Sequence, residues 1–154
     1  MTEQANYPIR KKNRLSSWDY SSHGVYFITI CTHNKECIFG TVQKLNTLGN
    51  IAKSELENLE SHYHGVFVDN FIIMPNHVHA IIVLENQLKS LNEIVGNYKA
   101  GVSRKIRNHY PDMIVWQRSF HDHIIRNEES YKKIWQYVEC NDQKWTEDCF
   151  FIIE

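Results

Sequence analysis

Two histidines separated by one residue open the segment HVHAIIVL, and their spacing is the first indication of chemistry in this chain. Side chains on a β-strand alternate between its two faces, so His77 and His79 should project side by side from one face. The apolar residues that follow predict a strand buried on both faces, where imidazoles need polar partners. A metal ion is one such partner, since neutral imidazole is a common ligand. Two polar residues on a solvent-facing strand are the other interpretation, and the pair alone leaves both open.

An amphipathic helix is predicted near the end of the chain, over residues 128–140. At about 100° per residue, Ile134, Trp135 and Val138 lie within about 60° of Tyr131. This stripe predicts the buried face of the helix, with Tyr131 as part of the core. A metal held by two histidines needs further ligands, and the other sides of this helix offer candidates.

Tyr137 lies at the edge of the apolar stripe, about 100° from its centre, where its hydroxyl can reach a cleft. Asn141 follows one turn later, about 40° away on the same side of the helix. Gln136 points nearly opposite the stripe, toward solvent. The geometry therefore favours Tyr137 with Asn141 over Tyr131 or Gln136 as a functional pair. A boundary tyrosine and an asparagine at a helix end are also common structural features, and the pattern does not decide between the two interpretations.

His121 and His123 repeat the same spacing in the segment HDH. If they joined His77 and His79, the four imidazoles could form a zinc hydrolase centre. The sequence shows no glutamate near a histidine in the pattern of a base that activates water. We therefore expect one of these histidines to pack near the site or to steer DNA, and their role stays open.

Charge is segregated along the chain, although the formal net charge of −1 names no partner. Residues 1–22 form a polar, basic segment, predicted to be an arm, which includes Arg14. No acidic residue lies between Glu93 and Asp112, where several cations gather. A nearly neutral protein with such segregation can still present a basic groove to phosphate.

The four cysteines form no CxxC pair and follow no zinc-site spacing, which indicates free thiols. No apolar run follows the N-terminus, and none reaches the roughly 18 residues that a membrane span requires. We therefore expect a cytoplasmic protein without a membrane partner.

Hydrophobic patterns and capping signals predict the order β-α-β-β-α-β followed by a helix. Strands are expected at residues 24–33, 65–74, 77–85 and, as a strand or strand pair, 113–126; helices are expected at 46–63, from Ser90 to before Pro111, and at 128–140. Ser90 with Glu93 forms a capping box, and Asn127 can cap the last helix. This order predicts an α+β, ferredoxin-like antiparallel sheet with helices on one face and a further C-terminal helix.

Four blocks in order resemble the HUH single-tyrosine transposases, and within them the IS200-like, REP-associated tyrosine transposases. The blocks are YFITICTHNKECIFG (26–40), VDNFIIMPNHVHAIIVL (68–84), IVGNYKAGVSRKI (94–106) and VWQRSFHDHIIRNEESYKKIWQYVECN (115–141). They carry His-x-His after MPN and Tyr-x-x-x-Asn on the last helix, and the resemblance covers about residues 20–145. The family usually has proline directly after that asparagine, where this chain has Asp142. The change alters how the helix ends and spares the candidate ligand.

This resemblance implies a metal-dependent nuclease and strand transferase that acts on single-stranded DNA. Tyr137 would attack phosphorus, release a 3′-hydroxyl and hold the 5′-phosphate covalently, so that the strand can be rejoined elsewhere. His77 and His79 would bind Mg²⁺ or Mn²⁺ together with the amide oxygen of Asn141. The C-terminal helix would then be the catalytic helix of a single HUH transposase domain spanning residues 1–154.

DNA carrying REP-like hairpins is the partner that the resemblance implies. The cations expected to follow the DNA backbone are Arg14, Lys99, Arg104, Lys105, Arg107, Arg118 and Arg126. A monomer is favoured over a homodimer. A non-catalytic hairpin-binding protein is the competing function, with the zinc hydrolase as the third, and the sequence does not identify the DNA target.

Overall fold

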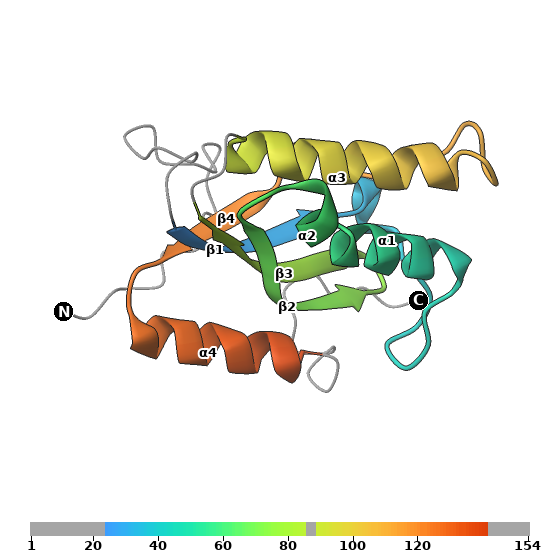
Figure 1. The fold of residues 1–154 in the computed structure, drawn as a ribbon. Helices are drawn as coiled ribbons and strands as arrows, with labels where there is room; N and C mark the ends of the chain where they lie inside the picture. Colours follow the sequence, from blue (N-terminus) through green and yellow to red (C-terminus); the bar gives the residue numbers. More distant parts are fainter. Residues whose placement is uncertain (1–23, 86–88, 142–154) are drawn as a thin grey trace.

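A computed structural model describes residues 24–85 and 89–141, which contain a four-stranded sheet and four α-helices (Figure 1). The elements are β1 (Gly24–Cys31), a short 3₁₀ turn (His33–Lys35), α1 (Thr47–Glu57), α2 (Leu59–His62), β2 (Val66–Met74), β3 (His77–Leu84), α3 (Leu91–Ile106), β4 (His121–Ile125) and α4 (Glu128–Glu139). The predicted basic arm, with Arg14, lies outside the described residues.

The strands are ordered β2-β3-β1-β4 across the sheet, and every neighbouring pair is antiparallel. This order confirms the predicted ferredoxin-like α+β fold. The register places Thr29 of β1 opposite His79 of β3 on one side and opposite His121 of β4 on the other. The central position of β1 therefore decides which side chains meet on each face of the sheet.

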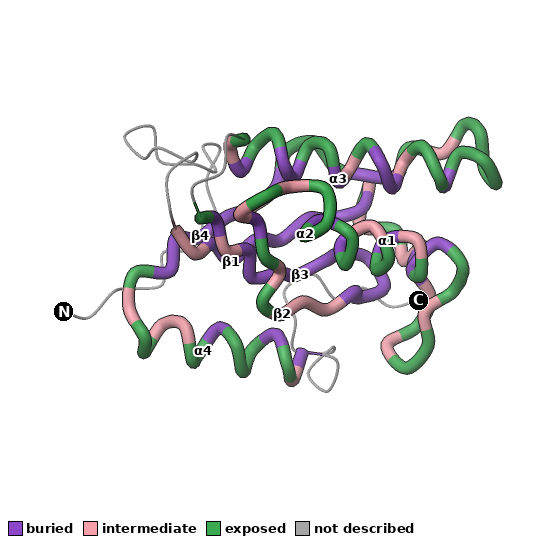
Figure 2. Tube along the Cα trace, viewed as in Figure 1, coloured by how far each residue is buried: buried purple, intermediate pink, exposed green. Residues whose placement is uncertain are grey.

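Helices cover both faces of the sheet, but unequally. In Figure 1, α1 and α3 lie on one face, and α4 lies alone on the opposite face. Residues of β1 alternate accordingly: Tyr26 and Ile28 enter the large core under α1 and α3, while Phe27 joins a small cluster with Ile134 and Val138 of α4. Figure 2 shows the buried residues concentrated along the central strands, with the outer side of α4 exposed. The prediction of paired helices on one face and a separate C-terminal helix is confirmed.

Side-chain caps define where the helices begin. Ser90 accepts a hydrogen bond from the backbone N–H of Glu93 at 3.2 Å, as its capping box predicts. Asn127 accepts from the N–H of Ser130 at 2.7 Å and starts α4 at the predicted residue. The helix predicted over 46–63 is instead interrupted at Asn58, which ends α1 and leaves α2 as a single turn.

The prediction of a strand or strand pair over residues 113–126 is largely wrong. Only His121–Ile125 joins the sheet, as β4, while Trp116 makes an isolated bridge with Thr32. The chain before β4 is irregular because Ser119 adopts a left-handed φ of 65°. Lys99 holds this segment by donating hydrogen bonds from Nζ to the carbonyls of Gln117 (2.9 Å) and Ser119 (2.8 Å).

The prediction that Trp135 is buried in α4 is also wrong, since its exposed fraction is 36%. Only Ile134 and Val138 of this helix are buried, and Tyr131 is half-buried against the same cluster. The helix contacts the sheet mainly along β2 and β3. A helix packed alone on a sheet buries a narrow stripe, so a residue at the stripe's edge stays partly in solvent.

Candidate functional site

His77 and His79 lie on the sheet face that α4 covers, and both are fully or almost fully buried, with exposed fractions of 0% and 1%. Their Nε2 atoms face each other at 3.1 Å, and their ring centroids are 4.5 Å apart. Strand alternation explains this pairing, because residues i and i+2 share a face. The two imidazoles are therefore placed to act together on one proton or one cation.

The opposite ring nitrogens decide which atoms these histidines present to each other. Nδ1 of His77 lies 2.7 Å from Oδ1 of Asn76, whose Nδ2 donates to the carbonyl of Lys35 at 3.2 Å. Since Oδ1 can only accept, Nδ1 of His77 carries the proton, and in the neutral ring Nε2 carries a lone pair. Nδ1 of His79 lies 2.9 Å from Oγ1 of Thr29. That hydroxyl can donate or accept, so His79 can adopt either tautomer.

Two arrangements of the pair follow from these contacts. When Thr29 donates to Nδ1 of His79, Nε2–H of His79 can donate to Nε2 of His77. When Thr29 instead accepts from Nδ1–H, both Nε2 lone pairs converge, which is the arrangement that a cation needs. At bond lengths of about 2.1 Å, adjacent ligands lie about 3.0 Å apart around an octahedral ion and about 3.4 Å apart around a tetrahedral one. The spacing of the two Nε2 atoms is nearer to the octahedral value.

Tyr137 extends from α4 to the histidine pair. Its hydroxyl lies 3.5 Å from Nε2 of His79, and its ring meets the rings of His79 and Phe27 edge-on, with centroids 5.3 and 6.0 Å apart. Burial of Ile134 and Val138 fixes the rotation of α4 that aims Tyr137 at this face. With an exposed fraction of 36%, its side chain remains accessible to a substrate.

Asn141, one turn beyond Tyr137, carries a buried amide oxygen that accepts no hydrogen bond. Its exposed fraction is 1%, while its backbone N–H donates to the carbonyl of Val138 at 3.4 Å. A buried oxygen without a donor costs about 1–3 kcal/mol. Hard cations such as Mg²⁺ take amide oxygens as ligands. The amide together with the two imidazoles therefore fits a divalent cation.

Tyr131 is directed to a different partner. Its hydroxyl donates a short hydrogen bond to Oδ2 of Asp69, and this bond is the main reason that the pKa of Tyr131 rises to about 12. Asp69 is the extra residue of a β-bulge between Val68 and Asn70. Asn70 in turn donates from Nδ2 to the carbonyl of Trp135 at 3.4 Å. The bulge in β2 thus anchors α4 from below the site.

His121 and His123 lie on the same sheet face, one strand further from the pair, because they pair with Thr29 and Phe27 of β1. His123 is buried, with an exposed fraction of 9%. Within residues 24–85 and 89–141, no group of three or more His, Cys, Asp or Glu side chains is arranged to hold a metal. The four-histidine zinc centre considered from the sequence is therefore not formed there.

The predicted DNA-binding cations do not converge on the histidine face. Those of α3 lie across the sheet from α4 (Figure 1), and three of them contact the protein itself. Lys99 holds the segment before β4, Lys105 forms an ion pair with Glu55, and Arg107 donates from Nε to the carbonyl of Met113 at 3.3 Å. The side chains of Arg104, Arg118 and Arg126 are exposed. DNA binding by any of these residues, and by Arg14, stays a prediction.

Two side chains next to the histidines were missed by the sequence reasoning. Asn76 directly precedes His77 in the MPN segment, so its position was a usable signal. Thr29 is far from His79 in the sequence and reaches it only through the register of β1 and β3. Among the described residues, no helix is both long and apolar enough to cross a bilayer.

This arrangement of sheet, paired histidines and helix-borne tyrosine agrees with the comparisons to known proteins. The profile of the family "Transposase IS200 like" matches residues 20–141, and the chain belongs to that family. It is therefore a transposase, of a class of enzymes that cleave DNA.

Relatives are known both in sequence and in structure. An uncharacterised protein of Haemophilus influenzae (strain Rd) is 37% identical, and the alignment covers 99% of each chain. A REP-associated tyrosine transposase bound to a REP hairpin superposes with a TM-score of 0.62 at 17% identity, over 88% of this chain and 74% of the other. A protein from Deinococcus radiodurans R1, provisionally described as a transposase, gives 0.56 at 18% identity, over 84% and 96%. At such identities the two structures support the fold alone.

Proposed function

We propose that this transposase cleaves single-stranded DNA beside a hairpin and rejoins it through a covalent tyrosine intermediate, with Tyr137 as the nucleophile. The observation that carries this proposal is the position of the Tyr137 hydroxyl, 3.5 Å from the Nε2 atom of His79, which faces His77. A phosphate bound at the histidine pair would lie within reach of the phenolic oxygen, and such proximity supplies much of the rate of a transfer reaction.

The proposed reaction is a transesterification at phosphorus. The oxygen of Tyr137 forms a bond to phosphorus, the bond to the 3′-oxygen breaks, and the 5′-phosphate stays on the protein. The phenolic proton leaves, and the departing 3′-oxygen gains a proton, so one phosphodiester replaces another. Attack by a second 3′-hydroxyl reverses these changes and joins the strand to a new end.

His77, His79 and Asn141 would hold a divalent cation, Mg²⁺ or Mn²⁺. When bound, that ion would polarise and orient the scissile phosphate. Asn76 and Thr29 keep the two imidazoles directed at each other through their Nδ1 atoms. Phe27 stacks on the ring of His79, with centroids 5.2 Å apart, and limits its rotation.

A hairpin-bearing strand is the substrate that the comparisons support. The structural relative bound to a REP hairpin has the same fold, and the family acts in DNA transposition. A single tyrosine can cut only one strand, which fits an unpaired segment beside the hairpin stem. Arg104, Arg118 and Arg126 are the exposed cations proposed to contact phosphates.

The proposal is tested by trapping the covalent adduct. A hairpin oligonucleotide with an unpaired flank is labelled at its 3′ end and incubated with Mn²⁺, and the protein is then denatured and separated by electrophoresis. The label should move to the protein, whereas a 5′ label should stay on a shortened DNA strand with a free 3′-hydroxyl. Tyr137→Phe should remove the adduct, and Tyr131→Phe, on the same helix, is the matched control.

Each alternative gives its own result in this assay. Binding of the hairpin without any adduct, in the presence of Mg²⁺ or Mn²⁺, would refute covalent catalysis and favour a hairpin-binding protein. Two cut fragments with no protein-bound label, restored by Zn²⁺ alone after chelation, would favour hydrolysis. Loss of the adduct in Tyr131→Phe but not in Tyr137→Phe would assign the nucleophile to the other tyrosine.

A further inference from the structure

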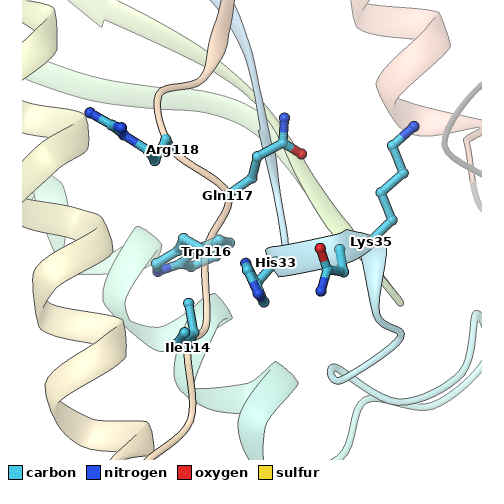
Figure 3. Close-up of a pocket in the computed structure, with 7 residues that line it drawn as sticks. His33, Lys35, Ile114, Trp116, Gln117 and Arg118 are labelled. Carbon is cyan, nitrogen blue, oxygen red and sulfur yellow. The ribbon is translucent and has the colours of Figure 1, made fainter.

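A cavity of about 600 Å³ opens beside the C-terminal end of β1, between the 3₁₀ turn at 33–35 and the segment 114–118 (Figure 3). Figure 3 shows Arg118 and Lys35 on opposite sides of this cavity, with Trp116 and His33 between them. Its lining contains no carboxylate, and the side chain of Ile114 is 60% exposed. The cavity therefore combines an apolar contact surface with cations at its edges.

The walls of this cavity are fixed by backbone hydrogen bonds. The N–H of His33 donates to the carbonyl of Val115 at 2.9 Å, and the N–H of Gln117 donates to that of Cys31 at 3.0 Å. Lys99 secures the far end of the segment, and the indole N–H of Trp116 donates to the carbonyl of Lys99 at 3.1 Å. The cavity is thus built into the fold, as ligand pockets usually are.

Strained backbone is concentrated at the same place. In the described part of the chain, the non-glycine residues with a left-handed φ are Asn34 (53°), Lys35 (55°) and Ser119 (65°). Two of them line the cavity, and the third follows Arg118 directly. Left-handed residues cost free energy and cluster at functional sites, where the surrounding structure holds them in place.

A short chain of hydrogen bonds joins the cavity wall to the histidine pair. The carbonyl of Lys35 accepts from Nδ2 of Asn76, at 3.2 Å, and Oδ1 of Asn76 accepts from Nδ1 of His77, at 2.7 Å. The cavity therefore lies next to the place where the proposed function puts the scissile phosphate. A strand held at His77 would pass its neighbouring nucleotide close to this opening.

We infer that the cavity binds one unpaired nucleotide of the DNA strand, adjacent to the phosphate that is cleaved; this inference rests on the proposed function. The base would lie against Ile114 and the ring of His33, and the amide of Gln117 could pair with its edge. Lys35 and Arg118 would face its flanking phosphates. A base in a duplex is stacked and paired, so only a single-stranded segment could place one here.

The inference is tested by measuring binding, which does not require cleavage. A hairpin oligonucleotide is prepared as a series in which each variant lacks one base of the unpaired flank or of the hairpin loop. Gel-shift titrations with the Tyr137→Phe protein should show one position, directly beside the mapped cut, where base loss weakens affinity by about tenfold, the size of one base–aromatic or apolar stacking contact. In Ile114→Ala this penalty should largely disappear, because the contact is already lost.

Matched variants separate the cavity from general effects. Phe67→Ala removes another exposed apolar side chain (44% exposed), on the edge strand β2, and should leave the positional penalty intact. Arg118→Ala should weaken binding of every oligonucleotide in the series by a similar factor, since phosphate contacts carry no base information. Thermal melting of each variant establishes that the fold is kept.

Two results would overturn the inference. If Ile114→Ala changed affinity equally at all positions, the cavity would hold no base. If the suppressed position lay in the hairpin loop, a base would bind there but not beside the cut. Failure of the proposed function is seen separately, as absence of a covalent adduct with the wild type, and it leaves this binding pattern measurable.

Discussion

Thr29 offers a sharp test of how the histidine pair is oriented. Thr29→Val keeps the shape of the side chain and removes the hydroxyl, which lies 2.9 Å from Nδ1 of His79. Since Thr29 is buried (5% exposed), no water replaces the lost partner, and a buried unpaired polar atom costs about 1–3 kcal/mol. In the metal-competent state Nδ1 carries that unpaired proton, so Mn²⁺ affinity should fall about 10- to 100-fold, the range for lost outer-shell partners of ligating histidines.

The assay is Mn²⁺ titration of covalent adduct formation, paired with direct Mn²⁺ binding followed by electron paramagnetic resonance. Thr29→Ser retains a hydroxyl and should restore most of the affinity. Saturating Mn²⁺ should recover much of the activity of Thr29→Val, because the ligands themselves remain. Unchanged Mn²⁺ affinity in Thr29→Val, with a normal melting temperature, would refute the view that this hydroxyl sets the tautomer of His79.

Three further outcomes follow from individual side chains. Asn141→Leu should abolish Mn²⁺-dependent adduct formation while leaving thermal stability equal or higher, because it replaces a buried unpaired oxygen with an apolar group; a destabilised protein would show that the amide has a structural role. The stabilising bond of Tyr131 needs its proton, so with a pKa raised to about 12 this contribution is complete below about pH 10 and is lost as the pH rises through 12. Chemical denaturation of wild type and Tyr131→Phe should therefore differ at pH 9 and converge above pH 12. Arg104→Gln should lower the salt dependence of hairpin binding by about 0.7 per lost phosphate contact. Lys105→Gln should change it less, because that amine is already paired with Glu55, and the reverse order in gel-shift titrations would contradict these contacts.

The parts of the site that were predictable depend on local periodicity. The alternation of a strand placed His77 and His79 on one face, and the helical wheel placed Tyr137 beside the buried stripe of α4. Both rules need only the spacing of residues within one element. The capping side chains Ser90 and Asn127 were predictable for the same reason, since each acts within one turn of its helix.

The errors occurred where distant segments compete for the same backbone or surface. Residues before β4 have the composition of a strand, but Lys99 and the left-handed Ser119 hold them out of the sheet. Trp135 fits the apolar pattern of α4 and yet is 36% exposed, because the helix packs alone on its face of the sheet. Composition reports what a segment could do, and the surrounding contacts decide among those outcomes.

By itself, the sequence determined the order of strands and helices, the family resemblance and the shared face of the histidine pair. Only the tertiary structure decided that Thr29 meets His79 across 50 residues of chain, and that Tyr137 reaches the same imidazole across 58. It also decided that the segments around Lys35 and Arg118 enclose one cavity. The physical reason is that strand register and helix docking are set by burial and hydrogen bonding between remote segments, which no local pattern encodes.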